Sequence, residues 1–316
     1  MKILELFSGY GTASFALKRI GMNYELVGYS DIDKYANQCF KQNHCPYDKD
    51  DKLRLGDVTK INPNELEDFD LLTGGFPCQA FSNAGKRKGE IDPRGTLFNE
   101  IIRIAEVKQP KYMLLENVKG FTFKKFKDTF DKVLSELDRI GYTVYWKVLN
   151  SKDFGVPQNR ERVWFVCFRK DVEHVFEFPK ERELELVVKN ILLPLVNRDK
   201  INNKRLNQIL SFKTGKENPK YELTGDTPSG VSRQKDRIYS TISPTLNCTV
   251  DEVLFEIDNE ILKLTGKEHF RLMGFFKDEI NLNSLTERQI KKLAGNGQDV
   301  NVVTLLFKQM FGGRKR

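Results

Sequence analysis

The first 168 residues alternate short apolar runs with stretches of helical periodicity, and no other feature constrains the fold as strongly. This alternation is typical of βαβ units, which build a parallel sheet with helices on both faces. The sequence therefore predicts an α/β fold with a doubly wound, mostly parallel sheet. The expected strands and helices, in chain order, are residues 3–6, 13–20, 25–29, 35–40, 70–73, 97–105, 112–115, 126–140, 143–149 and 163–168.

A second, smaller domain is expected from about residue 171, where the alternation stops. Residues 186–221 carry eight basic residues against two acidic ones and have no clear period. Turn residues then separate short runs that are typical of β-strands. These runs are residues 238–242, 253–257 and 261–264.

The C-terminal stretch returns to a helical pattern. Apolar residues stand at helical spacing in Val300–Phe311, after the turn Gly295–Gly297. We therefore expect a larger domain of residues 1–170, completed by residues 290–316, and a smaller β-containing domain of residues 171–289.

The charge and the cysteines limit the class of protein. A formal net charge of +8 favours an anionic partner such as nucleic acid, although solvated lysines give the same charge. The five cysteines are scattered and form no cluster with the three histidines, so neither disulfides nor a metal site are expected. No run suits a signal peptide or a membrane span, so we expect a cytoplasmic protein with no membrane partner.

Glycines and acidic residues follow the first expected strands. In the turn Phe7–Gly11, the glycines allow positive φ and close approach of a ligand to the backbone. Asp31 stands where a nucleoside ribose lies in a doubly wound fold, and Asp57, at a third expected strand end, suits an adenine amino group. Alone, the glycine turn is as often an ordinary βα turn as a ligand site, and each acid alone is more often a helix N-cap. Together, in this order, they favour a nucleoside cofactor.

Cys78 follows a proline in the stretch TGGFPCQAFS, and a cysteine beside buried chain is usually a small core hydrophobe. Its neighbours favour a chemical role instead. If the strands are parallel, Glu116 reaches the same edge of the sheet, which pairs a nucleophile with an acid. Arg160 and Arg162 precede the last expected strand, and surface ion pairs are the alternative for them.

The motifs FSGYG, GGFPCQAFS, ENV and QNRERVWFV follow one another along the chain, and in this order they resemble the DNA (cytosine-5) methyltransferase family of bacterial or phage type. Further matches are Ser30–Tyr35, Gly56–Val58, Ser243–Leu246, Phe270–Phe275 and Gly295–Gly297. The resemblance covers nearly the whole chain except about residues 171–236. It implies a Rossmann-like methyltransferase fold, S-adenosyl-L-methionine as cofactor with no metal ion, and double-stranded DNA as partner.

The resemblance also implies the catalytic roles. Cys78 would add to carbon 6 of cytosine as a thiolate, which activates carbon 5 for methylation. Glu116 would protonate ring nitrogen 3, which requires a carboxyl group that is protonated in the complex. Arg162 would hold the carbonyl oxygen of the base, and Arg160 would support the loop or a backbone phosphate.

The cofactor contacts are implied in the same way. They are Phe7, Gly9, Tyr10, Gly11, Asp31, Ile32, Asp57, Val58, Pro77, Leu97 and Asn296. Gly297 departs from the family, because many members have serine at this position, and this puts one hydroxyl contact in doubt.

The resemblance further implies how DNA is bound. Residues 80–96 match the mobile loop that closes over DNA in the family, and a solvated basic loop is the alternative. The target cytosine has to be flipped out of the duplex to reach Cys78. Residues 171–236 correspond to the stretch that reads bases, which makes the smaller domain a target-recognition domain, but the sequence does not give the recognition site.

Three other functions are weighed against this one. An RNA-methylating branch shares the motifs, but its Cys-Phe-Thr motif is missing from the chain. A catalytically silent relative is disfavoured because Cys78 and Glu116 are both present. A dinucleotide oxidoreductase lacks any need for these motifs. We expect a monomer that acts in restriction-modification, with a separate endonuclease, or in phage DNA protection.

Overall fold

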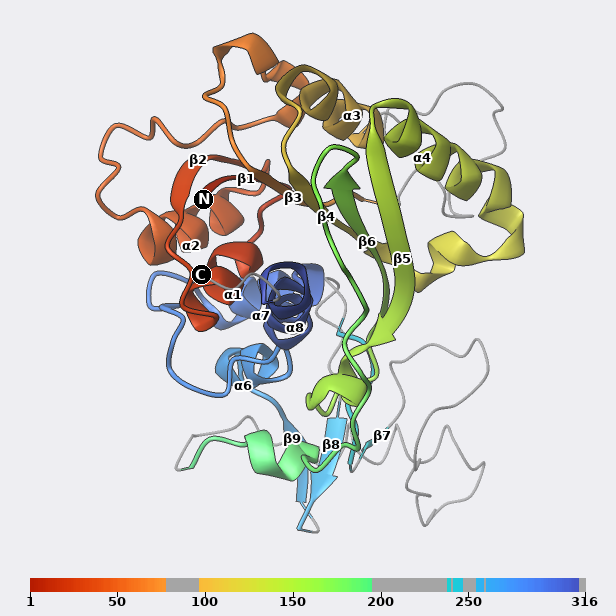
Figure 1. Ribbon diagram of the computed structural model, residues 1–316. Helices are drawn as coiled ribbons and strands as arrows, with labels where there is room; N and C mark the ends of the chain where they lie inside the picture. Colours follow the sequence, from red (N-terminus) through yellow and green to blue (C-terminus); the bar gives the residue numbers. More distant parts are fainter. Residues whose placement is uncertain (78–96, 195–237, 240, 247–253, 259, 313–316) are drawn as a thin grey trace. The chain divides into compact units, whose positions relative to one another are not determined.

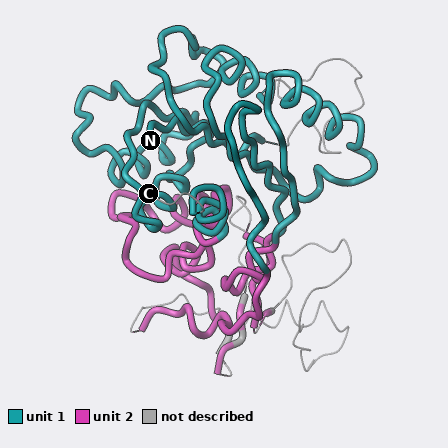
Figure 2. Tube along the Cα trace, viewed as in Figure 1, with its two compact units in different colours: residues 1–149, 161–180, 302–316 teal, residues 150–160, 181–301 magenta. Residues whose placement is uncertain are grey.

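The computed structural model describes residues 1–77, 97–194, 238–239, 241–246, 254–258 and 260–312. The chain divides into two compact units (Figure 2). Unit 1 consists of residues 1–149, 161–180 and 302–316, and unit 2 of residues 150–160 and 181–301.

Unit 1 is built on a six-stranded sheet with the order β2-β1-β3-β4-β6-β5 (Figure 1). The strands are β1 (Lys2–Leu6), β2 (Glu25–Ser30), β3 (Leu71–Gly75), β4 (Tyr112–Val118), β5 (Tyr142–Asn150) and β6 (Glu161–Arg169). The pairs β1–β2, β1–β3 and β3–β4 are parallel, whereas β6 is antiparallel to β4. The sheet is therefore mixed, with its parallel part at the N-terminal strands.

Helices cover both faces of this sheet, as the alternation predicts. The helices of unit 1 are α1 (Thr12–Arg19), α2 (Lys34–His44), α3 (Leu97–Lys108), α4 (Lys127–Arg139) and most of α8 (Val300–Phe311). On one face, Leu4, Leu72 and Met113 join the buried apolar residues of α3 and α4 in one cluster. On the other, Tyr29 stacks on Phe40 of α2, with ring centroids 4.1 Å apart.

The third expected strand end is not part of a strand. Near Asp57, only Arg54 forms a bridge, with Tyr29 of β2, and residues 55–57 continue without regular structure. Asp57 instead caps the short 3₁₀ turn η1 (Val58–Lys60), because its Oδ1 accepts the N–H of Thr59 at 3.0 Å. A polar cap so close to the bridge ends the extended pairing.

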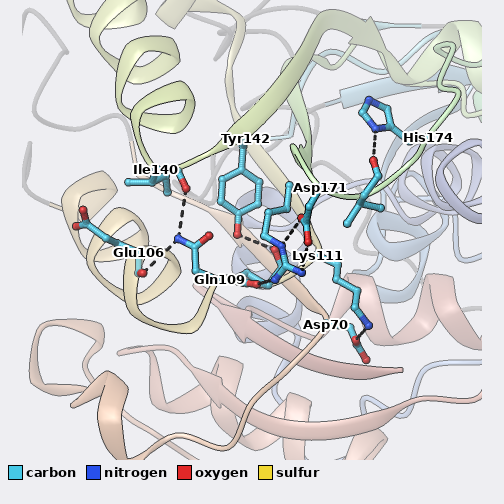
Figure 3. Close-up of polar contacts among 11 residues, drawn as sticks. Asp70, Glu106, Gln109, Lys111, Ile140, Tyr142, Asp171 and His174 are labelled. Atoms are coloured by element: carbon cyan, nitrogen blue, oxygen red, sulfur yellow. Dashed lines mark hydrogen bonds and ion pairs between the residues drawn. The ribbon is translucent and has the colours of Figure 1, made fainter.

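Polar contacts hold together the edge of the sheet at which β3 and β4 begin (Figure 3). Lys111 and Asp70 form an ion pair of 2.9 Å, and the Tyr142 hydroxyl donates to the Pro110 carbonyl at 2.6 Å. The Gln109 side chain donates to the Ile140 carbonyl at 3.3 Å (Figure 3). These contacts connect the start of β4 to neighbouring segments, and they help to fix the register in which β4 pairs along the sheet.

Glu5 is a buried carboxyl group inside an otherwise apolar strand. Helix α1 begins after Gly11, which has no side chain to cap the free N–H groups of the first turn. Glu5 on β1 caps the helix instead, because its Oε1 accepts hydrogen bonds from the Ser14 N–H at 3.1 Å and from the Ser14 hydroxyl. Glu5 therefore satisfies one of the free N–H groups in the first turn of the helix from its position on the sheet.

Burial raises the pKa of Glu5 from 4.5 to about 7. The folded state holds the proton between these values, so the free energy of unfolding falls as the pH rises through this window. Glu5→Gln removes the dependence. We expect the variant to gain roughly 3 kcal/mol relative to the wild type from about pH 5 to about pH 8, measured by urea unfolding.

Two buried histidines make the free energy of unfolding depend on pH in the opposite direction. Their contribution is the same in the variant and in the wild type, so it cancels in the difference between the two. Burial lowers the pKa of His44 to about 3 and that of His269 to about 4, so both are neutral when folded. Their stabilisation is lost as the pH falls below the unfolded value of about 6.5. A stability difference that stays constant with pH would contradict the role of Glu5.

Unit 2 contains a small sheet and helices. The order of its three strands is β7-β8-β9, with β7 and β8 parallel and β8 and β9 antiparallel. The elements are β7 (Ile238–Tyr239), β8 (Leu254–Ile257), β9 (Glu260–Lys263), α6 (Gly266–Arg271) and α7 (Glu287–Asn296). The three β-like runs of the sequence thus form strands, but β7 ends at Tyr239, well short of the expected residue 242.

Candidate active site

The carboxyl ends of four adjacent strands meet at one edge of the sheet in unit 1. Leu6 pairs with both Ser30 and Gly74, and Gly75 pairs with Glu116. Because the strands are parallel, the residues that follow them lie at the same edge, where α/β proteins bind their ligands. The turn after β1, the acid after β2, the segment Gly75–Pro77 and Glu116 therefore share this edge.

Glu116 and Arg162 form a close ion pair at this edge. Glu116 is on β4 and Arg162 is on the antiparallel neighbour β6, and Arg162 Nε lies 2.8 Å from Glu116 Oε1. The side chains are only 12% and 15% exposed, respectively. Arg162 Nη1 donates to the Glu161 carbonyl at 2.9 Å. The sheet thus holds together an acid and an arginine, the two residues for which the resemblance implies contacts with the same base.

Arg160 has different surroundings, all within unit 2. It is 2% exposed, and Nη1 donates to the Leu246 carbonyl at 3.2 Å. Its Nη2 donates to the carbonyls of Gly295 at 3.1 Å and Gly297 at 2.5 Å. These carbonyls flank Asn296, which ends α7 and is exposed. The guanidinium therefore fixes the backbone on both sides of a residue that the sequence assigns to the cofactor.

The turn after β1 has an unusual backbone. Phe7, Gly9 and Gly11 all have positive φ, of 51°, 54° and 82°. A bulky residue such as Phe7 rarely adopts this conformation, and such outliers cluster at ligand sites. The Gly9 N–H donates to Asp31 Oδ2 at 2.9 Å, which joins the turn to the end of β2.

Asp31 and its neighbour Ile32 lie side by side in sequence but in contrasting surroundings. Asp31 Oδ1 accepts the Asp33 N–H at 2.8 Å, and burial raises the pKa of Asp31 although backbone hydrogen bonds oppose the shift. Asp33, not Asp31, caps α2. Ile32 is 84% exposed, which is unusual for a large aliphatic side chain.

These observations fit the adenosine part of S-adenosylmethionine. A side chain at Gly9 would have no atom within 4 Å, so the turn leaves room for a ligand against its backbone. Asp31 keeps carboxylate lone pairs for ribose hydroxyls. An adenine ring would cover Ile32 and remove its apolar surface from water.

The surroundings of the remaining residues expected to bind the cofactor give less indication of a ligand. Val58 is buried beside Asp57 in the core cluster that Leu97, the first residue of α3, also packs against. Tyr10 has a buried side chain and offers only its backbone to the turn. Pro77 is half-buried after β3. Cys78, the expected loop 80–96 and most of the expected base-reading stretch 171–236 lie outside the described residues.

Two residues that the structure brings to the turn were missed by the sequence reasoning. Glu5 gives one signal, as the only acid within the first apolar strand. His44 gives none, yet its ring lies beneath Gly11.

Within the described ranges, no group of three metal-ligating side chains is found and no helix is long and apolar enough to cross a membrane.

The fold is that of known methyltransferases. The solved structure of the S. pombe Dnmt2 methyltransferase has a TM-score of 0.71, covers 97% of each chain and is 22% identical, a likeness that shows the fold alone. The Type II methyltransferase M.HhaI of Haemophilus parahaemolyticus is 34% identical over 96% of this chain and 92% of its own length. The orphan methyltransferase M.SPRI of Bacillus phage SPR is 37% identical over 80% of this chain and 58% of its own length.

A family model also matches the chain. The model of the C-5 cytosine-specific DNA methylases matches residues 1–312, nearly the full length of the chain. The chain belongs to this family. Its enzyme class is therefore DNA (cytosine-5-)-methyltransferase, as expected from the motifs.

Proposed function

We propose that the protein transfers a methyl group from S-adenosylmethionine to carbon 5 of a cytosine that is flipped out of a specific duplex DNA sequence, through a covalent adduct with Cys78. The observation that carries this proposal is the Glu116–Arg162 pair, 2.8 Å apart. It lies at the end of β4, directly beside the end of β3, from which the chain continues through Pro77 to Cys78.

The residues have a consistent chemical logic. The Cys78 thiolate forms a bond to carbon 6, and the electrons of the ring double bond move toward carbon 5 as Glu116, in the protonated form that this role requires, donates a proton to nitrogen 3. Arg162 orients Glu116 and can donate a hydrogen bond to the carbonyl oxygen at carbon 2. When bound, S-adenosylmethionine supplies an electrophilic methyl group. After carbon 5 has taken the methyl group, loss of the proton on carbon 5 expels the Cys78 thiolate and restores the double bond, and nitrogen 3 returns its proton to Glu116.

We assign the cofactor to the edge formed by β1 and β2. The turn Phe7–Gly11 would lie against the methionine part and Asp31 would bind the ribose hydroxyls. Ile32 and Val58 would contact the adenine faces, and Asp57 its amino group. Arg160 is assigned the supporting part of the two roles expected for it, because its donors are engaged with backbone carbonyls beside Asn296.

The product analysis tests this function. We expect the purified protein to bind S-adenosylmethionine in calorimetry and to place tritiated methyl groups on carbon 5 of cytosine in duplex DNA. The reason is the combination of a nucleoside-type turn with an acid–arginine pair at one sheet edge. Label found only on adenine, on the exocyclic amine of cytosine, or in RNA would overturn the proposal.

We further propose that residues 171–236, the expected recognition stretch, determine which DNA sequence the protein methylates. Replacing this stretch with that of a relative should change the methylated sequence but not the reaction, because base contacts and chemistry come from different segments. Bisulfite sequencing of DNA from expressing cells reads both. Unchanged methylation of the original site would contradict this division.

Single neutralisations separate two kinds of contact within this stretch. If Lys204 or Arg205 binds a phosphate, its change to Ala should lower the salt slope of DNA binding by about one. A base contact should instead cost roughly 1–3 kcal/mol at one position of the site.

The biological setting follows from the activity. We propose a monomer that acts in the cytoplasm of a bacterial cell or a phage-infected host. Its methylation would protect DNA, either beside a separate restriction endonuclease or in phage DNA without one.

A further inference from the structure

His44 is a buried imidazole at the end of α2 that contacts the cofactor turn from behind. The residue is 9% exposed, and its Nε2 lies 3.0 Å from the carbonyl oxygen of Tyr10. Its ring packs against Phe15 of α1, with centroids 4.4 Å apart, and against Phe40 of α2 at 4.8 Å. The ring therefore joins both helices to the middle of the turn.

The same ring accounts for the glycine at position 11. A Cβ atom on Gly11 would lie 2.3 Å from His44 Nε2 and 2.9 Å from Phe40 Cε2. The φ of +82° at Gly11 also favours glycine there. His44 thus occupies the space beneath the turn, while the space at Gly9, on the expected ligand side, is empty.

Lys18 fixes which nitrogen of His44 carries the proton. Its Nζ lies 3.3 Å from His44 Nδ1 and also donates to the Asn43 carbonyl at 3.1 Å. An ammonium group can only donate, so Nδ1 must accept, and the proton of the neutral ring is left on Nε2. Nε2 then donates to the Tyr10 carbonyl, and every polar atom of the ring has a suitable partner.

The charge state of the ring agrees with this arrangement. Burial, with a contribution from the charge of Lys18, lowers the pKa of His44 to about 3. The imidazole is thus neutral over the whole physiological range. Lys18 is the charged group that faces it, and Glu5 interacts electrostatically with Lys18.

We propose that His44 is a positioning residue for the cofactor: a neutral imidazole, held in one tautomer by Lys18, that fixes the Tyr10–Gly11 peptide in the conformation that binds S-adenosylmethionine. The proposal rests on the assignment of this turn to the cofactor. It concerns affinity for the cofactor, because His44 is on the far side of the turn from the ligand.

Calorimetric binding of S-adenosylmethionine to three variants tests the role. His44→Leu keeps an apolar side chain of similar size but removes the donor, and we expect the Kd to rise about tenfold, the loss typical of one buried hydrogen bond. His44→Gln carries an amide donor at a similar reach and should stay within about threefold of the wild type. Cys39→Ala, a buried change on the same helix, should lower Tm and leave the Kd unchanged.

Nitrogen NMR of the wild type provides a second reading that a packing role alone would not produce. The chain has three histidines, so the His44 signal is identified by its loss in His44→Leu. We expect shifts of a neutral ring with the proton on Nε2 throughout the neutral range. In Lys18→Met, Nδ1 loses its donor, and the ring should begin to titrate at a higher pH.

The outcomes are distinct. An unchanged Kd in His44→Leu, or a proton on Nδ1 in the wild type, would overturn the role of His44. If the wild-type protein does not bind S-adenosylmethionine at all, the assignment of the turn to this cofactor fails instead.

Discussion

Cys78→Ala abolishes methylation and leaves cofactor binding intact: this is the largest effect we expect from a single substitution. Without the thiolate, carbon 5 of cytosine is too weak a nucleophile, and no other group of the protein is proposed to add to carbon 6. Turnover should fall to background in a tritium-transfer assay. The calorimetric Kd for S-adenosylmethionine should stay close to the wild-type value, because the cofactor is assigned to the ends of β1 and β2.

A trapping experiment isolates the covalent step. A duplex with 5-fluorocytosine at the target should form a stable adduct with the wild type, because the fluorine cannot leave as a proton does. Cys78→Ala should form none. Cys167→Ala is the matched control, since Cys167 is a fully buried cysteine on β6, and burial raises the pKa of its thiol far above neutrality. Near-normal turnover by Cys78→Ala would make Cys78 a core residue after all.

Glu116→Gln should lower kcat by roughly 10²–10⁴-fold, the usual contribution of a positioned general acid. The amide keeps the size of the side chain but cannot supply the proton to nitrogen 3 of the base. In the free protein, the amide also lacks the charge that pairs with Arg162 at 2.8 Å. Single-turnover rates under saturating DNA and cofactor measure the chemical step directly.

The control for this substitution is an ion pair between the residue that follows β4 and the first residue of β6. Lys119 and Glu161 form an ion pair of 2.7 Å beyond the end of β4, with side chains that are 42% and 37% exposed. Exposed pairs contribute little, so Lys119→Met should change the rate by less than about tenfold. Equal losses in Glu116→Gln and Lys119→Met would mean that the edge of the sheet needs charge in general and no specific acid.

Much of the fold follows from periodicity. The ten elements expected in residues 1–168 all form, with ends shifted by a few residues at most, for instance Ala13–Ile20 against Thr12–Arg19 in α1. A stretch such as 55–57 was misjudged, because a single bridge to Tyr29 and a capping aspartate leave no further pairing. Sequence patterns report apolar spacing, whereas a strand also needs a partner of matching length.

The amino-acid sequence by itself determined the α/β class, the family and the residues grouped in the motifs. These depend on short segments whose residue types and order are fixed locally. Only the tertiary structure decided that Glu116 pairs with Arg162, that Arg160 holds the backbone around Asn296, and that His44 lies beneath Gly11. Each of these contacts joins residues far apart in sequence, and the contact depends on strand order, register and helix packing, which no local pattern specifies.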